Sequence, residues 1–149
     1  YRFSLGEIDP VQVEWLEISM ELSSNAPMYR ENFKSDIYVG LGETELGVWT
    51  SPGDYGARRG RFNPSWWSDT SSQYGLLKTW RVDNQGCTLD GEPLSSVTLA
   101  DLNLGGQDYL ALRIGVHADA AHVGGINLFG EQFGDFAQGI VVRVGYAKP

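Results

Sequence analysis

The chain has 149 residues, and 19 acidic against 11 basic side chains give it a net charge of −8. This length predicts one domain with a buried core, and five Trp, seven Tyr and six Phe argue against disorder. The acidic balance disfavours direct binding to DNA or to a membrane surface, since both need clustered positive charge. No run approaches the roughly 20 apolar residues of a membrane-spanning helix, and the single Cys87 excludes an internal disulfide scaffold.

The chain begins with Tyr1 rather than Met, and its first thirty residues lack the charged and apolar regions of a signal peptide. We therefore expect a missing upstream segment, which is either a processed leader or a whole N-terminal domain.

Apolar residues alternate with polar ones from Val11 to Leu22, which predicts β-structure with one solvated face. The apolar positions are odd-numbered up to Trp15 and even-numbered from Leu16. A phase change of this kind indicates one long strand with a bulge, or two strands that share a bend. A helix is the alternative, but the alternation fits it less well.

Two short apolar segments, Asp36–Val39 and Glu45–Trp49, flank Gly40–Glu43 and predict a hairpin. Leu76–Val82 is predicted to form a strand that ends in a turn at Asp83–Gly86.

The next strand is expected at Cys87–Leu89, before a turn at Asp90-Gly91. Thr98 is a candidate N-cap for a short helical turn over Val97–Leu102. Further strands are predicted at Tyr109–Val116, Ile126–Phe129 and Ile140–Tyr146. Eight to ten short strands with little helix indicate an all-β domain, a jelly-roll β-sandwich of the galactose-binding or carbohydrate-binding-module type.

The longest irregular segment runs from Ser51 to Tyr74, and long loops in compact domains are often functional. It holds Trp66 and Trp67 beside Asp, Asn and Arg residues. Aromatic faces next to planar hydrogen-bonding groups are typical of sugar recognition. The alternative is that both tryptophans cover the open end of the sandwich, with Arg58 or Arg59 stacked on them.

Other polar residues give weaker signals. The basic run Arg58–Arg61 could contact phosphate, although a solvated loop or an arginine paired with Asp54 or Asp69 explains it equally. His117 and His122 have no zinc-ligand spacing, and we expect His122 to bond a backbone carbonyl.

No catalytic or nucleotide-binding motif occurs, so we expect no enzyme, no metal and no cofactor. The alternative is that two of the acids Asp54, Asp69 and Asp135 form the catalytic carboxylate pair of a glycosidase. In the segment 124–136, rich in Gly and Phe, we expect three phenylalanines (129, 133 and 136) to close the core, and Asn127 and Gln138 to satisfy backbone groups.

Four segments occur together in the same order as in one known family: Leu22–Tyr29, Leu46–Gly60, Asn63–Trp67 with Gln73–Thr79, and His122–Gly134. The chain resembles, from Tyr1 to Tyr146, the C-terminal domain of bacterial predicted transcriptional regulators with an N-terminal winged-helix (ArsR-like) DNA-binding domain. One position departs from the family pattern: relatives carry an acidic residue after the glutamine, whereas Gln138 is followed by Gly139. If that acid holds a loop or a ligand in relatives, this chain has lost or replaced it.

The resemblance implies a cytoplasmic effector domain that contacts DNA only through the absent N-terminal domain, and from the acidic charge we expect no membrane contact. We expect it to bind a small polar ligand, such as a saccharide, and a homodimer is left open. The expected binding residues are Trp49, Asp54, Arg58, Arg59, Asn63, Trp66, Trp67, Tyr74 and Lys78. Two alternatives are a carbohydrate-binding module of a larger enzyme and a dimerisation domain without a ligand.

Overall fold

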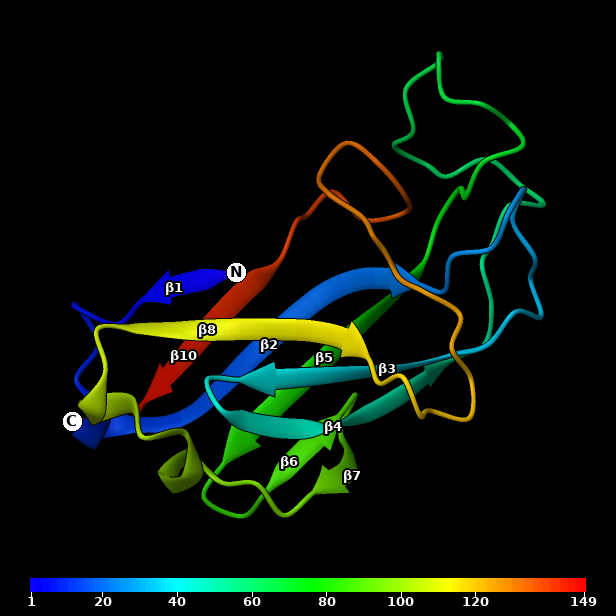
Figure 1. Ribbon diagram of the computed structural model, residues 1–149. Helices are drawn as coiled ribbons and strands as arrows, with labels where there is room; N and C mark the ends of the chain where they lie inside the picture. The colour runs from blue at the N-terminus through cyan, green and yellow to red at the C-terminus, as the bar shows by residue number, and fades with distance from the viewer.

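The computed structural model describes residues 1–149 and shows two antiparallel sheets packed face to face (Figure 1). The first sheet has the order β1 (Arg2–Ser4), β8 (Tyr109–Val116), β3 (Ser35–Leu41) and β4 (Thr44–Ser51). The second has the order β10 (Val141–Tyr146), β2 (Val13–Ser23), β5 (Leu76–Asp83), β6 (Cys87–Leu89) and β7 (Glu92–Ser95). A short strand, β9 (Asn127–Leu128), pairs with the end of β2. The predicted all-β sandwich is confirmed.

Helix is confined to three short 3-10 turns: η1 (Pro10–Gln12), η2 (Leu99–Leu102) and η3 (Leu104–Gly106). Thr98 caps η2 as predicted, and its backbone N–H donates to Asp101 Oδ2 at 2.8 Å. None of these helices has the length or apolar character needed to cross a membrane.

The phase change near Trp15 is a β-bulge in β2. Trp15 is paired with Gly145, but the next pair joins Val13 to Tyr146, so Glu14 has no partner on β10. An extra residue on one strand reverses which side chains face inward. Val13 and Leu16 are therefore both buried, as the prediction of one strand with a bulge requires.

The core lies between the two sheets. From the six-stranded sheet, Ile18 is paired with Trp80 and both are fully buried. Ile37 and Leu110 meet them from the four-stranded sheet within one apolar cluster. Full burial of one such side chain contributes about 1.5–3 kcal/mol, so this cluster is the main source of stability.

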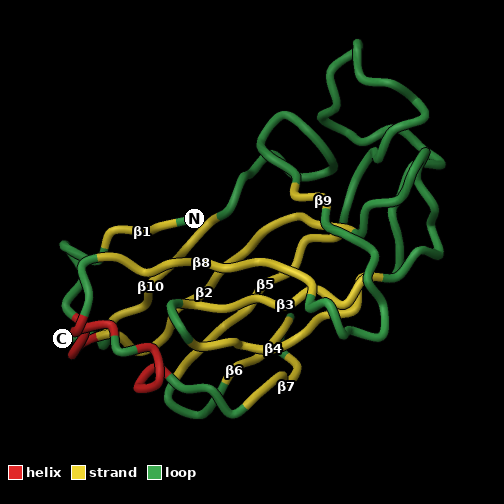
Figure 2. Tube along the Cα trace, viewed as in Figure 1, coloured by secondary structure: helices red, strands yellow, loops and turns green.

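The long connections gather at one end of the sandwich, and the 3-10 turns lie at the other end (Figure 2). β2 and β4 end at the loop-rich end, where β3 and β5 begin. The connections brought together there are 24–34, 52–75, 117–126 and 129–140. Four segments that are distant in the sequence therefore meet at one place.

Candidate functional site

The connection between β4 and β5 is held by an internal amide network. The Gln73 side chain is almost fully buried, and its Nε2 donates to the carbonyls of Ser68 (2.8 Å) and Ser71 (3.0 Å). Its Oε1 accepts from Asn63 Nδ2 at 2.8 Å, while Asn63 Oδ1 accepts from the backbone N–H of Gly134 at 2.7 Å. A loop without its own ladder needs such partners for its buried backbone groups. The network fixes the loop and joins it to the segment 129–140.

A second anchor surrounds Asp54, whose side chain has no exposure to solvent. Its Oδ2 accepts from the Ala26 N–H at 2.9 Å and its Oδ1 from Asn127 Nδ2 at 3.3 Å. Asn127 Nδ2 also lies 2.9 Å from the Ser24 carbonyl and 2.8 Å from Ser72 Oγ. These contacts connect two of the loops with β9, and they confirm that Asn127 satisfies a backbone carbonyl.

Glu21 is a third anchor, and it is also fully buried. Its carboxylate accepts backbone N–H groups from Gly75 at 2.8 Å, Asp135 at 2.9 Å and Phe136 at 3.1 Å. Desolvation raises the pKa of Glu21 above its ordinary value, although the three N–H groups act in the opposite direction. One side chain thus ties the start of β5 and the segment 129–140 to β2.

Arg58 completes the frame with a bidentate ion pair and a ring contact. Its guanidinium donates to both carboxylate oxygens of Asp135, at 2.9 and 2.5 Å. These hydrogen bonds lower the pKa of Asp135. Arg58 Cζ also lies 3.7 Å from the centroid of the Tyr74 ring, which stacks on Tyr55 at 5.2 Å. The stack is braced on one side by a cation–π contact.

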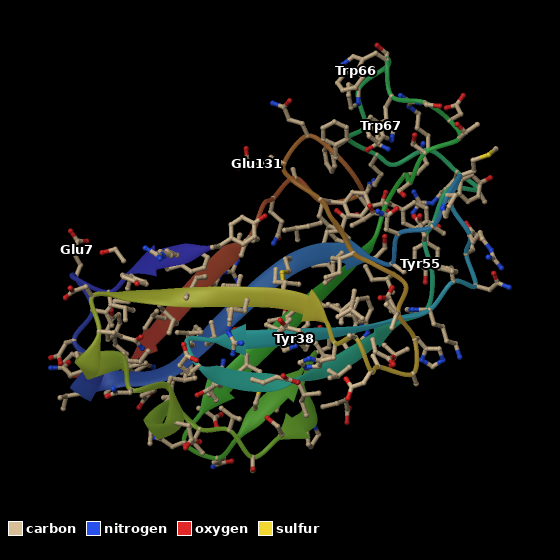
Figure 3. All side chains as sticks on the ribbon, in the orientation of Figure 1. Glu7, Tyr38, Tyr55, Trp66, Trp67 and Glu131 are labelled. Atoms are coloured by element: carbon tan, nitrogen blue, oxygen red, sulfur yellow. The ribbon has the colours of Figure 1, made fainter.

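Trp66, Trp67 and Phe133 form an aromatic cluster. The two tryptophans lie at the outer end of the loops (Figure 3). Each pair of rings meets edge to face, with centroids 5.0 to 6.0 Å apart. Trp66 is 72% exposed, whereas Trp67 is half-buried. Arg59 secures this region through Asp69 at 2.9 Å and through the carbonyls of Trp67 and Pro64.

A pocket of about 350 Å³ opens beside Trp67. Its lining is aromatic, amide and hydroxyl in character, and it contains no Asp, Glu, Lys, Arg or His. The lining residues are Asn25, Ala26, Met28, Tyr29, Trp67, Thr70, Ser71, Ser72 and Asn127. Trp67 Nε1 donates to the Ser72 carbonyl at 2.9 Å, so this indole offers the pocket its ring rather than its N–H.

The wall of the pocket at Met28 and Tyr29 has an unusual backbone. Both residues have left-handed conformations, with φ of 55° and 43°. Gly56 permits this arrangement, because a Cβ there would lie 2.2 Å from the Tyr29 ring. Consecutive non-glycine residues in this region are unfavourable, and such strain is concentrated at functional sites.

The nine residues expected to bind a ligand separate into three groups. Trp67 lines the pocket and Trp66 adjoins it. Five others brace the loops through the contacts above: Asp54, Arg58, Arg59, Asn63 and Tyr74. Trp49 and Lys78 lie on β4 and β5, where Lys78 Nζ is 5.3 Å from the Trp49 ring and 2.8 Å from Asp90. The structure does not bring these two residues to the pocket.

Sequence reasoning did not place most of the pocket residues in a site. Ser71 and Ser72 lie within the long loop, but no sequence pattern marks them as binding residues. Asn25 and Tyr29 lie in a different connection, between β2 and β3. Among the phenylalanines, Phe129 is buried as predicted, but the prediction for Phe136 is wrong because it is 37% exposed.

Both histidines pair with carboxylates on the four-stranded sheet. His117 Nε2 lies 2.8 Å from Glu45, and its ring stacks on Tyr38 with centroids 4.3 Å apart. His122 Nδ1 lies 3.2 Å from the Asp36 carboxylate, so the predicted backbone carbonyl partner is wrong. No group of three or more His, Cys, Asp and Glu residues is arranged to hold a metal ion.

The three acids considered as a carboxylate pair have separate partners. Asp54 bonds Ala26 and Asn127, whereas Asp69 and Asp135 pair with different arginines.

Comparison with protein-family models, curated proteins and solved structures found no match to this chain.

Proposed function

We propose that this chain is the ligand-sensing effector domain of a bacterial transcriptional regulator and that its loop pocket binds a small uncharged polar ligand such as a saccharide. DNA binding would belong to a separate N-terminal winged-helix domain in the cytoplasm, as the sequence resemblance implies. The proposal includes jelly-roll connectivity, which is supported by the way β2–β3, β4–β5 and β7–β8 pass between the two sheets. The domain acts in this account by binding rather than by catalysis.

The composition of the pocket lining carries the proposal. A sugar ring offers C–H groups to an aromatic face and hydroxyl groups to amides and other hydroxyls. Trp67 and Tyr29 supply rings, and Asn25 and Asn127 supply amides. No charged side chain lines the pocket, so an anionic ligand would lose its hydration without gaining a counter-charge.

Asn127 gives the pocket a defined polarity. Its Nδ2 group is directed to the Ser24 carbonyl, Ser72 Oγ and Asp54 Oδ1, which fixes the amide orientation. Its Oδ1 accepts no hydrogen bond from the protein, so that atom remains for a ligand donor. A hydroxyl group meets this requirement, whereas a phosphate or carboxylate oxygen does not.

The same contacts connect the pocket to the β-sandwich. Asn127 and Asp54 join the pocket to the ends of β2 and β4. A ligand would affect an attached DNA-binding domain only if it bound two arrangements of these loops with different affinities. Addition of a sugar to the intact regulator should therefore change its affinity for operator DNA. A carbohydrate-binding module of an enzyme would use the same pocket without this effect.

Thermal unfolding of the chain in the presence of neutral mono- and disaccharides tests the pocket. We expect at least one of them to raise Tm, and gluconate and sugar phosphates to have no effect. Asn25→Ala should reduce the rise, because Asn25 lines the pocket but has no side-chain hydrogen bond to lose. Asn84→Ala, in the turn between β5 and β6, is the matched control and should respond like the wild type.

If no sugar raises Tm, or if Asn25→Ala responds like Asn84→Ala, the proposed ligand or its site is wrong.

A further inference from the structure

We propose that Trp66 forms a second sugar-binding surface next to the pocket, so that the natural ligand is an oligosaccharide rather than a single sugar. This inference rests on the proposed function and extends it to the class of saccharide. It concerns the Trp66 indole, most of whose surface is exposed to solvent.

Trp66 differs from the other four tryptophans in its exposure to solvent. Trp80 is fully buried and Trp49 is 9% exposed, whereas Trp66 is 72% exposed. Trp15 and Trp67 are half-buried. A large aromatic side chain left in water adds little to stability by burial, and its ring is available to stack on a ligand.

The Trp66 indole is held in place although it is exposed. Its ring packs edge to face against Phe133, with 6.0 Å between centroids and an angle of 76°. The loop on either side is fixed by hydrogen bonds from Arg59 to the carbonyls of Pro64 and Trp67. An aromatic surface that is already ordered loses little conformational freedom when a ligand binds it.

Trp66 also lies one ring away from the pocket. Its centroid is 5.9 Å from that of Trp67, which lines the pocket, and the two rings meet at 72° (Figure 3). The pocket itself, at about 350 Å³, lies near the lower end of the range of roughly 300–1,000 Å³ for small-ligand sites. A longer saccharide must therefore extend out of the pocket, and Trp66 is the adjacent ordered aromatic surface.

Calorimetric titration of the chain with sugars of increasing length tests this inference. The probes are β-1,4-linked glucose, xylose and mannose series and an α-1,4-linked glucose series, each from the monosaccharide to the tetrasaccharide. For the series that binds, we expect the wild type to bind the longer sugars about tenfold more tightly than the monosaccharide, as one stacking contact provides. Trp66→Ala should remove this difference and leave the affinity for the monosaccharide unchanged.

Two controls isolate the ring of Trp66. Trp66→Phe should retain part of the gain with length, because an aromatic face remains. Tyr146→Ala removes an aromatic side chain of 44% exposure from the end of β10 and should behave like the wild type.

The possible failures are distinguishable. Equal affinity for short and long sugars, or identical behaviour of Trp66→Ala and wild type, would overturn the role of Trp66 and leave the pocket intact. A change of oligomeric state in Trp66→Ala, with no change in sugar affinity, would assign this surface to a protein contact instead. Failure of every sugar to bind the wild type would refute the proposed function itself, and this inference with it.

Discussion

Glu21→Gln tests whether the buried carboxylate holds the loops that form the site. Glutamine has nearly the same shape, but its NH₂ group cannot accept a hydrogen bond. If its Oε1 keeps the N–H groups of Gly75 and Asp135, the NH₂ group faces the N–H of Phe136, now 3.1 Å from Glu21 Oε2. One part-buried donor then has no acceptor, which costs about 1–3 kcal/mol. At neutral pH the amide also avoids the desolvation penalty that the carboxylate pays, so Tm should fall by less than the roughly 2–12 °C that 1–3 kcal/mol implies for a chain of this length.

Differential scanning calorimetry at neutral pH measures this change, and hydrogen exchange locates it. We expect faster exchange of the Asp135 and Phe136 amides in the variant than in the wild type. Glu17→Gln is the matched control, because Glu17 lies on the same face of β2 but is partly exposed. Its one ion pair, with Arg81, is long at 3.7 Å and therefore weak. It should change the free energy of unfolding by less than about 1 kcal/mol.

The pH dependence gives an independent check with a definite sign. Burial raises the pKa of Glu21 in the folded chain, with a smaller unfavourable contribution from the nearby Asp135 carboxylate. A raised folded pKa means that this group favours folding most at acidic pH and loses that contribution as the pH rises through the folded pKa. The stability difference between wild type and Glu21→Gln should therefore be largest in acid and smaller at neutral pH. Equal stability of the two proteins throughout, with unchanged exchange at Asp135 and Phe136, would refute the role assigned to Glu21.

Three further predictions concern other parts of the fold. Arg58→Ala should destabilise the domain by about 1 kcal/mol more at neutral pH than in acid, because Arg58 lowers the pKa of Asp135 and that stabilisation is lost as the carboxyl becomes protonated. The contact of Arg58 with the Tyr74 ring is lost at every pH and leaves a smaller cost in acid; urea unfolding at several pH values measures both parts. Gly134→Ala should destabilise the domain by roughly 2–4 kcal/mol, because φ at this position is +78° and a Cβ would lie 2.4 Å from Glu21 Oε1. Gly130→Ala is the control and should be neutral in the same assay, because a Cβ there meets no atom within 4 Å. Burial raises the pKa of Cys87 to about 11, so at pH 8 the folded protein should react with iodoacetamide at least about 100-fold more slowly than the unfolded chain; equal rates would contradict the burial.

The fold could be predicted because its signals are local. The alternation on either side of Trp15 indicated the bulge before any partner strand was known, and Glu14 is the extra residue. The hairpin around Gly42 and the cap at Thr98 follow from the conformations that a few neighbouring residues prefer.

The site could be predicted only in part, because its residues come from separate connections. The long loop was identified correctly as irregular, but its polar residues were expected to face a ligand. Asn63 and Asp54 instead bond backbone and amide groups inside the loops, since a buried loop must satisfy its own polar atoms. Trp49 was expected to provide a stacking surface, but the pairing of β4 with β3 turns it into the core. Proximity of Tyr29, Ser72 and Asn127 depends on tertiary packing, for which one sequence gives no signal.

The measurement that tests the central claim most directly is a ¹H–¹⁵N NMR titration of the chain with the neutral sugar that raises Tm most. The account predicts chemical-shift changes at the Asn25 and Asn127 side-chain amides, the Trp67 indole N–H and the Ser72 backbone amide, and none at Asn84 at the other end of the sandwich. Changes concentrated at Trp49 and Lys78, or no change at any of the pocket residues, would contradict it.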